Sequence, residues 1–302
     1  MEKVVSELSE IIPTCFDPAH RNPSWLNAQG QRRCLPYFYI LGMPKCATTA
    51  IFNQLIRHPH IFCGSNQVKE PYFWSRGAHF VQNGCTIQQY MQNFDEFAQH
   101  MRPDWITGEA SVQTFWERNV ASLLAHFQPD AKLIVIFRNP LGRAHSEFRY
   151  MHPTATAEQI DDLMHRELDV AEKYTDVQAE ALCRNDPLLK GMFCTYLPTW
   201  LANFSPAQLL ILSFEHYCSK PRECLHLIFK FLGVPPPTRS QWKRILASKE
   251  SNKSVNQVPM SAELAQRVQA FYTPFNQDLY QTMKKYKGPR SPISDFDYNA
   301  KK

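Results

Sequence analysis

The stretch Pro36-Tyr37-Phe38-Tyr39-Ile40-Leu41-Gly42-Met43-Pro44-Lys45-Cys46-Ala47-Thr48-Thr49-Ala50 carries the clearest structural signal in this chain. Its first half is an apolar, aromatic run that is typical of a short buried strand. A Gly-Met-Pro break then ends the strand. Apolar side chains recur afterwards from Ile51 to Ile56 with the spacing of one helix face, and they stop before Pro59. The sequence therefore predicts a strand, a tight loop and the start of a helix.

The loop of this unit carries the groups that bind an anion. Backbone N–H groups at a helix N-terminus and the helix dipole both favour negative charge. Lys45 adds a positive charge, and Thr48 and Thr49 add hydroxyl donors. The order Gly42-x-x-Lys45-x-x-Thr48-Thr49 differs from the Walker A pattern G-x-x-x-x-G-K-[ST]. We interpret the loop as a cradle for a phosphate-like group. The alternative is an ordinary strand-turn-helix unit with a surface lysine.

Composition limits the class of protein. The 302 residues, 44% hydrophobic and 20% charged, suffice for one large folded domain and argue against global disorder. The net charge of +5 suits an anionic ligand but is too small to indicate nucleic acid. We expect a single domain over residues 36–288, with an irregular leader over residues 1–35 and a flexible tail over residues 289–302.

The sequence indicates neither a membrane span nor a signal peptide. Its apolar stretches are all shorter than the roughly 20 residues of a transmembrane helix, and residues 1–12 carry glutamates where a signal peptide has a basic and then an apolar segment. This favours a cytosolic chain, or one whose upstream anchor is missing. The nine cysteines form no C-x-x-C pair, which argues against a structural zinc site. A Cys15–Cys34 disulfide is one open possibility.

Two further apolar runs predict strands. Residues 132–137 are uninterrupted and rich in β-branched residues, as in strands buried on both faces, and residues 209–212 are similar. Helices are expected from Thr156, with a capping box, to about residue 181, and from near Ser261 to Pro274. Strands that alternate with helices predict an α/β fold, with a P-loop-like parallel sheet flanked by helices.

Polar residues follow the strand at 132–137. Asn139-Pro140 suits a helix N-cap and first helical position, and Arg143, Ser146 and Tyr150 then share one helix face. Because ligands of open parallel sheets bind beyond the carboxyl ends of the strands, Arg138 and Ser146 predict a second anion site beside the cradle. Two such sites suit a nucleotide with a 5′ group and a 3′-phosphate. A salt bridge at the strand end is the alternative for Arg138.

Other polar residues have two interpretations each. In Lys69-Glu70-Pro71 the proline biases Glu70 to an extended backbone, which places the Lys-Glu pair in a loop. The aromatic residues 72–74 would stack on adenine or a sugar, or belong to the core. Glu109 and Ser111 would line an acceptor side or hold the loop. His145 would be a base or a structural histidine.

In this order, the following motifs resemble the PAPS-dependent sulfotransferases: Tyr37 to Thr49, Lys69-Glu70-Pro71, and Arg138-Asn139-Pro140 with Arg143 and Ser146. The most similar branch is that of the Golgi carbohydrate enzymes, especially the N-acetylgalactosamine 4-sulfate 6-O-sulfotransferase type. Arg33-Cys34-Leu35-Pro36 and Phe271-Tyr272-Thr273-Pro274-Phe275-Asn276 also resemble that branch.

The resemblance implies a role for each matching residue. The 5′-phosphosulfate of PAPS would be held by Lys45, Cys46, Ala47, Thr48 and Thr49. Lys45 would also stabilise the charge that builds on the bridging oxygen as the sulfuryl group leaves. Arg138 and Ser146 would hold the 3′-phosphate through charge-assisted hydrogen bonds.

The resemblance also places the acid–base chemistry. Glu70 matches the general base of the heparan-type relatives, and Lys69 would either orient the sulfuryl oxygens or favour the ionised form of Glu70. In-line transfer needs a base, a cation at the leaving group and positioning, so no metal is expected. Tyr72 stands where those relatives often carry histidine. The Lys-Gly-Arg phosphate loop of many relatives is not visible, and Lys253 is assigned to the nucleotide in its place.

The family implies a sulfotransferase that moves a sulfuryl group from PAPS to a carbohydrate hydroxyl, on a sulfated galactosaminoglycan of the chondroitin or dermatan type, in the Golgi lumen. Four basic residues would meet such a polymer or form a solvated surface: Arg76, Arg118, Arg149 and Lys190. One alternative is a cytosolic sulfotransferase for a small-molecule hydroxyl or amine. Others are a non-catalytic nucleotide binder and a P-loop kinase or NTPase, against which Arg138 argues because an acidic residue is expected there.

Overall fold

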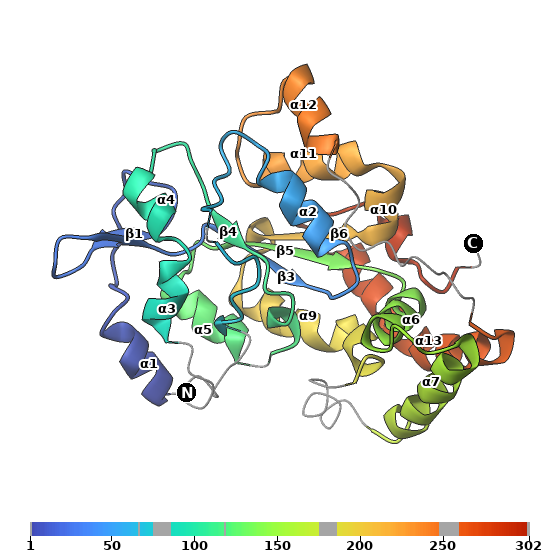
Figure 1. Ribbon diagram of the computed structural model, residues 1–302. Helices are drawn as coiled ribbons and strands as arrows, with labels where there is room; N and C mark the ends of the chain where they lie inside the picture. The colour runs from blue at the N-terminus through green and yellow to red at the C-terminus, as the bar shows by residue number, and fades with distance from the viewer. Residues whose placement is uncertain are drawn as a thin grey trace.

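The computed structural model describes residues 2–65, 67–74, 86–117, 119–174, 186–247 and 260–300 (Figure 1). Four strands form its main sheet: β3 (Phe38–Gly42), β4 (Gly108–Glu109), β5 (Lys132–Phe137) and β6 (Leu209–Ser213). Their order is β4-β3-β5-β6, and each neighbouring pair is parallel. The predicted α/β fold with a parallel sheet flanked by helices is confirmed.

Helices cover both faces of the sheet. In Figure 1, α2 (Thr48–Leu55), α11 (Pro221–Phe231) and α12 (Arg239–Leu246) lie above it, while α5 (Val120–Phe127), α9 (Phe193–Asn203) and α13 (Ala262–Lys285) lie below. Further helices are α3 (Ile87–Gln92), α4 (Asp95–His100), α6 (Pro140–Met151), α7 (Ala157–Ala171) and α10 (Phe214–Ser219). Short 3₁₀ turns occur at Thr114–Trp116, Leu189–Gly191, Pro206–Gln208 and Ile293–Phe296.

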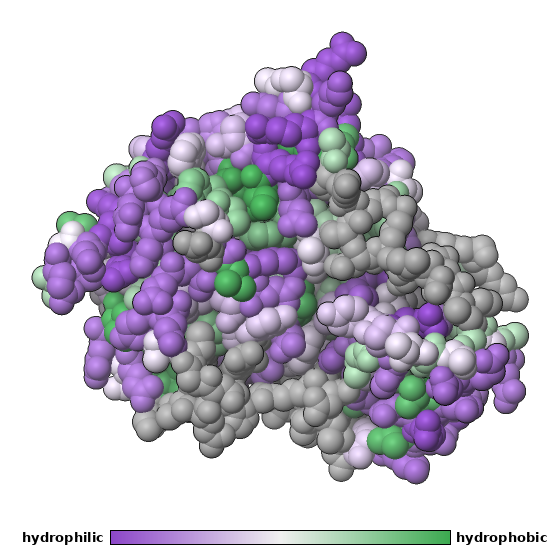
Figure 2. All heavy atoms as spheres, viewed as in Figure 1, coloured by the Kyte–Doolittle hydropathy of each residue, from purple (hydrophilic) through white to green (hydrophobic). Residues whose placement is uncertain are grey.

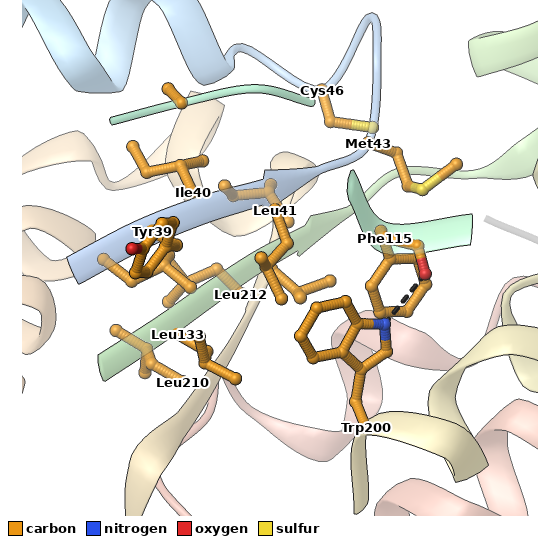
Figure 3. Close-up of a cluster of buried hydrophobic side chains, with 14 of the residues drawn as sticks. Tyr39, Ile40, Leu41, Met43, Cys46, Phe115, Leu133, Trp200, Leu210 and Leu212 are labelled. Carbon is orange, nitrogen blue, oxygen red and sulfur yellow. Dashed lines mark hydrogen bonds between the residues drawn. The ribbon is translucent and has the colours of Figure 1, made fainter. Parts of the chain in front are cut away.

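The core lies between these layers because the central strands are apolar on both sides. Every residue of β3 and β6 is buried, as is every residue of β5 after Lys132. In Figure 3, Leu41 of β3 and Leu133 of β5 point into the same cluster as Leu210 and Leu212 of β6. Hydrophobic side chains on the face seen in Figure 2 are scattered among hydrophilic ones.

The segment before residue 36 is more ordered than we expected. It contains α1 (Glu2–Ser9) and an antiparallel hairpin of β1 (Ser24–Leu26) and β2 (Arg32–Cys34). The Asn22 side chain donates to the carbonyl oxygens of Leu35 and Thr107 and accepts from the Thr107 N–H. The prediction of an irregular leader is therefore wrong, because this segment contains a helix and a hairpin and is bonded to the rest of the chain.

The segment after residue 288 also has fixed structure. The Ile211 N–H donates to the Pro289 carbonyl at 3.1 Å, and the Ser291 N–H donates to the Ile211 carbonyl at 3.0 Å. Phe296 is fully buried. The prediction of a flexible tail over residues 289–302 is therefore wrong for residues 289–300, because this segment covers the outer edge of β6.

Two helix ends and one disulfide also differ from expectation. Helix α7 begins at its predicted capping box but ends at Ala171, not near residue 181. Helix α13 continues through Pro274 to Lys285. Cys15 and Cys34 are free thiols. In the part of the chain that the structure describes, no helix is both long and apolar enough to cross a membrane.

Candidate functional site

The loop between β3 and α2 forms the predicted cradle. Lys45 and Ala47 both adopt left-handed backbone conformations, with φ of 64° and 62°. Ala47 is the N-cap of α2 and provides no side-chain hydrogen bond to its first turn. Because the first N–H groups of a helix have no partner within the helix, those of the Thr48–Thr49 turn suit an anion.

Lys45 supplies the positive charge of this cradle. Its Nζ lies 4.1 Å from the centre of the exposed Tyr150 ring, and it forms no ion pair with a described carboxylate. Burial lowers the pKa of Lys45, and the nearby Arg138 adds to that effect, whereas the Glu147 carboxylate opposes it. A half-buried ammonium without a carboxylate partner is suited to an anionic ligand.

Arg138 connects the cradle to the strand beside it. Its Nη1 donates to the Lys45 carbonyl at 2.9 Å, and its guanidinium stacks over the Phe214 ring at 4.4 Å. No described carboxylate pairs with it, so the structure does not bear out the alternative of a salt bridge. Ser146 is partly buried on α6, the helix that follows β5, whereas the cradle follows the neighbouring strand β3.

Helix α6 begins as predicted, and it buries an arginine for which no burial was predicted. Asn139 is the N-cap and accepts from the Leu141 N–H at 3.1 Å, with proline at the first helical position. Arg143, predicted to share a face with Ser146 and Tyr150, is fully buried instead. Its guanidinium pairs with Glu147 and donates to the Pro187 carbonyl.

Lys190 completes this buried cluster. Its Nζ lies 2.8 Å from Glu147 Oε1, so the Glu147 carboxylate is shared between two cations. The prediction that Lys190 meets a polymer or forms a solvated surface is wrong, because the residue is only 8% exposed. Sequence analysis missed Glu147, although its spacing of four residues from Arg143 is the spacing of a helical ion pair.

The Lys69–Tyr72 turn brings together the predicted acid–base residues. Lys69 Nζ pairs with one oxygen of the Glu70 carboxylate, and the Tyr72 hydroxyl donates to the other. Burial lowers the pKa of Lys69, and Glu70 opposes that effect. Phe73 and Trp74 are buried, so they belong to the core and offer no stacking surface.

This turn is attached to the segment that follows β4. The Ala110 N–H donates to the Lys69 carbonyl at 2.9 Å, and the Tyr72 N–H donates to Ser111 Oγ at 3.0 Å. Ser111 in turn donates to the buried Glu109 carboxylate at 2.5 Å. Burial raises the pKa of Glu109 to about 7. Of the two roles considered for Glu109 and Ser111, these contacts favour holding the loop.

The three loops meet at one edge of the sheet. Strand β3 lies between β4 and β5, so the cradle lies between the Lys69–Tyr72 turn and Arg138. A Cβ on Gly42 would approach the Val112 carbonyl oxygen to 2.9 Å, which shows how closely the end of β3 approaches the segment after β4. Glycine at position 42 permits that approach.

The remaining candidates are His145, which is next to Ser146 on α6, and residues outside the described part of the chain. Burial lowers the pKa of His145, which lies on α6, and Arg149 adds to the effect. Its imidazole therefore favours the neutral form. Lys253, Arg76 and Arg118 lie outside the residues that the structure describes.

A family model described as "Sulfotransferase domain" matches residues 36–277. The chain belongs to this family. Its enzymes take the sulfuryl group that they transfer from PAPS, 3′-phosphoadenylyl sulfate. The prediction of a sulfotransferase-domain enzyme is confirmed.

Relatives in this family include carbohydrate enzymes. Carbohydrate sulfotransferase 15 of Mus musculus is 28% identical over 305 residues, which covers 83% of this chain and 54% of that protein. Bifunctional heparan sulfate N-deacetylase/N-sulfotransferase 4 of Mus musculus is 24% identical over 310 residues, covering 93% of this chain and 34% of that protein. The chain thus spans about half, or less, of the length of these relatives.

The fold also has a solved counterpart. A sulfotransferase from Alicyclobacillus acidocaldarius superposes with a TM-score of 0.62 at 19% identity, covering 86% of this chain and 98% of that one. At this identity the likeness concerns the fold, and it agrees with the parallel sheet and its flanking helices.

Proposed function

We propose that this chain transfers a sulfuryl group from PAPS to a hydroxyl of a sulfated galactosaminoglycan, as found in chondroitin or dermatan sulfate. The observation that carries the proposal is the hydrogen bond from Arg138 to the Lys45 carbonyl, because it joins two cationic loops at one sheet edge. The Lys69–Glu70 pair lies in a loop that is bonded to the segment after the neighbouring strand, β4. Similarity to carbohydrate sulfotransferase 15 supports a carbohydrate acceptor. A place in the Golgi lumen is proposed from the resemblance of the sequence motifs to the Golgi carbohydrate enzymes.

The cradle fits the phosphosulfate end of the donor. Thr48, Thr49 and the backbone of Cys46 and Ala47 would hold it at the N-terminus of α2, where the helix dipole favours negative charge. Lys45 would stabilise the charge on the oxygen that leaves the sulfur. Arg138 and Ser146 would hold the 3′-phosphate, with Lys253 as a further nucleotide contact.

The Lys69–Tyr72 turn fits the acceptor half of the reaction. PAPS supplies the sulfuryl group and leaves as PAP. As the acceptor oxygen bonds to sulfur and the bond from sulfur to the phosphate oxygen breaks, Glu70 would take the hydroxyl proton. Lys69, already paired with Glu70, would turn its ammonium toward the sulfuryl oxygens. Each group thus has one function in a single displacement.

The first experiment measures the donor site by calorimetric titration with PAP, without magnesium, against adenosine 5′-monophosphate. PAP should bind at least about 10-fold more tightly, because a charge-assisted hydrogen bond contributes roughly 1.5–3 kcal/mol. Equal affinities would remove Arg138 and Ser146 from the 3′-phosphate. An absence of binding to either nucleotide would contradict the donor site altogether.

The second experiment identifies the acceptor. Transfer of ³⁵S from PAPS should be fastest to chondroitin 4-sulfate, slower to desulfated chondroitin and undetectable with a simple phenol. Fast sulfation of the phenol would replace the glycan acceptor with a small molecule. Nucleotide binding without transfer to any acceptor would indicate a non-catalytic binder.

The variant Arg138→Ala tests the binding of the PAPS 3′-phosphate separately from the acceptor. Loss of the guanidinium should raise the KM for PAPS by about 10- to 100-fold, because it removes a charge-assisted contact to phosphate. The exposed Arg166→Ala, on α7, is the matched control and should leave this KM unchanged. A similar KM in the parent and in Arg138→Ala would place the 3′-phosphate elsewhere.

A further inference from the structure

The Glu70 carboxylate is connected to a buried carboxylate by a short series of hydrogen bonds. The Tyr72 hydroxyl donates to Glu70, the Tyr72 N–H donates to Ser111 Oγ at 3.0 Å, and the Ser111 hydroxyl donates to Glu109 Oε2 at 2.5 Å. Glu109 is 1% exposed and Ser111 is 2% exposed. The series therefore lies mostly inside the protein and ends at the surface of the turn.

A second connection holds the same turn from the other side. The Trp74 Nε1–H donates to the Tyr90 hydroxyl at 3.2 Å, and that hydroxyl donates to Glu109 Oε1 at 3.4 Å. Each oxygen of the Glu109 carboxylate thus accepts a bond that leads back to the Lys69–Trp74 segment. A carboxylate that accepts two such bonds fixes the positions of both donors.

Tyr72 needs this support because its backbone is unfavourable. Its φ is 54°, in the left-handed region that residues with a side chain seldom adopt. Such a conformation is unfavourable and persists only where surrounding contacts fix it. The Ser111 hydroxyl holds the Tyr72 amide, and the Ala110 N–H, which donates to the Lys69 carbonyl at 2.9 Å, holds the start of the turn.

From these contacts we infer that Ser111 and Glu109 are positioning residues for Glu70. The inference rests on the proposed role of Glu70 as the base, and neither Ser111 nor Glu109 contacts the reacting atoms in it. Glu109 orients the Ser111 hydroxyl so that its lone pair meets the Tyr72 N–H. Tyr72 then keeps its left-handed backbone and directs its hydroxyl to Glu70. Without that support the carboxylate is displaced from the acceptor hydroxyl.

The test combines rates with a measurement that needs no acceptor. Ser111→Ala should lower kcat by about 10- to 100-fold, because displacing a catalytic group by an ångström has effects of that size. It should leave the affinity for PAP within about 2-fold, since the cradle lies in the separate loop between β3 and α2. Amide hydrogen exchange at Tyr72 should become faster, because its N–H loses its acceptor.

A double-variant comparison separates positioning from general loosening. In a Glu70→Gln background, Ser111→Ala should lower the residual rate by less than about 2-fold, since the base on which it acts is already gone. Ser111→Thr, which keeps the hydroxyl, should restore most of the parent rate. Thr114→Val is the matched control, because the buried Thr114 hydroxyl has no hydrogen-bond partner in the described chain.

Three results would overturn the inference. They are a parent-like kcat in Ser111→Ala, an equally large loss in the Glu70→Gln background, and a parallel loss of PAP affinity. A parent protein that sulfates none of the acceptors contradicts the proposed function instead. Hydrogen exchange at Tyr72 then decides the structural part of the inference, and unchanged protection in Ser111→Ala would contradict it.

Discussion

Lys45 shows how burial prepares a single side chain for an anion. It lies in a left-handed turn, half-buried, next to the Tyr150 ring and without a described carboxylate partner. The Lys45 ammonium can therefore pair with an anionic ligand, because no described carboxylate of the protein neutralises it. Glu109 is the opposite case, a buried carboxylate whose hydrogen bonds are all directed inward to the protein.

Lys45→Ala should lower kcat by about 100- to 1000-fold, as the loss of one group that stabilises a leaving oxygen does in other enzymes. Steady-state kinetics with saturating PAPS measure this effect. Lys45→Arg keeps the charge and should retain more of kcat than the alanine variant. A near-normal kcat in Lys45→Ala would remove Lys45 from the leaving-group role.

Glu109 should also affect stability as a function of pH. Its pKa is raised from 4.5 to about 7 in the folded protein, so the folded state binds more protons than the unfolded state between these values. The free energy of unfolding should therefore fall as pH rises from 4.5 to about 7 and level off above that.

Urea unfolding of the parent and Glu109→Gln at several pH values measures this contribution. The stability of the parent relative to the variant should fall by up to roughly 3 kcal/mol across that range. Comparing the two proteins at each pH cancels other titrating groups, such as Asp186, whose pKa is raised to about 6. A constant difference between parent and variant would contradict the raised pKa.

At the scale of elements, α6 is positioned by a buried cluster of charges. Arg143 and Lys190 share the Glu147 carboxylate, and Arg143 also donates to the Pro187 carbonyl. These contacts link α6 to the segment that begins at Asp186. They set the rotation of the helix, and with it the side on which Ser146 lies.

Glu147→Gln should lower the free energy of unfolding by about 3–5 kcal/mol, because two buried cations lose their counter-charge. Thermal unfolding measures the change, with the exposed Asp278→Asn on α13 as control. Adding Lys190→Met should recover part of the loss, since one unpaired charge is removed with it. If Glu147→Gln matches the control, the cluster does not contribute to stability.

At the scale of the whole molecule, the sheet brings three distant loops to one edge. The cradle at Lys45 follows β3, Arg138 follows β5, and the turn at Glu70 is bonded to the segment that follows β4. The carboxyl ends of these strands lie at the same edge because the strands of the main sheet are parallel. The segment after residue 288 covers a lateral edge of the sheet, along the outer side of β6. The site and the terminal segment thus depend on the same sheet.

Phe296→Ala should therefore lower the free energy of unfolding by about 3–5 kcal/mol, as the truncation of a buried phenylalanine does. The effect should appear in urea unfolding followed by tryptophan fluorescence. The exposed Ser294→Ala, two residues earlier, is the control. A flexible tail would give no difference between the two variants.

The sequence by itself determined the local units. A continuous apolar run encodes a buried strand, and a glycine-proline break or an Asn-Pro pair marks its end, because these signals act within a few residues. This is why β3, β5, β6 and the N-caps of α6 and α7 were predictable. The same local patterns pointed to Lys45, Arg138 and the Lys69–Glu70 pair, and to the family.

Only the tertiary structure decided which polar groups lie inside and what they contact. Lys190 was expected to meet a polymer or to form a solvated surface, but it is buried and shares the Glu147 carboxylate with the buried Arg143. The connection from Glu109 through Ser111 to Tyr72 joins two segments of the chain, because the Tyr72–Ser111 bond spans 39 residues of sequence. The physical reason is that desolvation and cross-strand hydrogen bonds depend on neighbours in space, which no local pattern specifies.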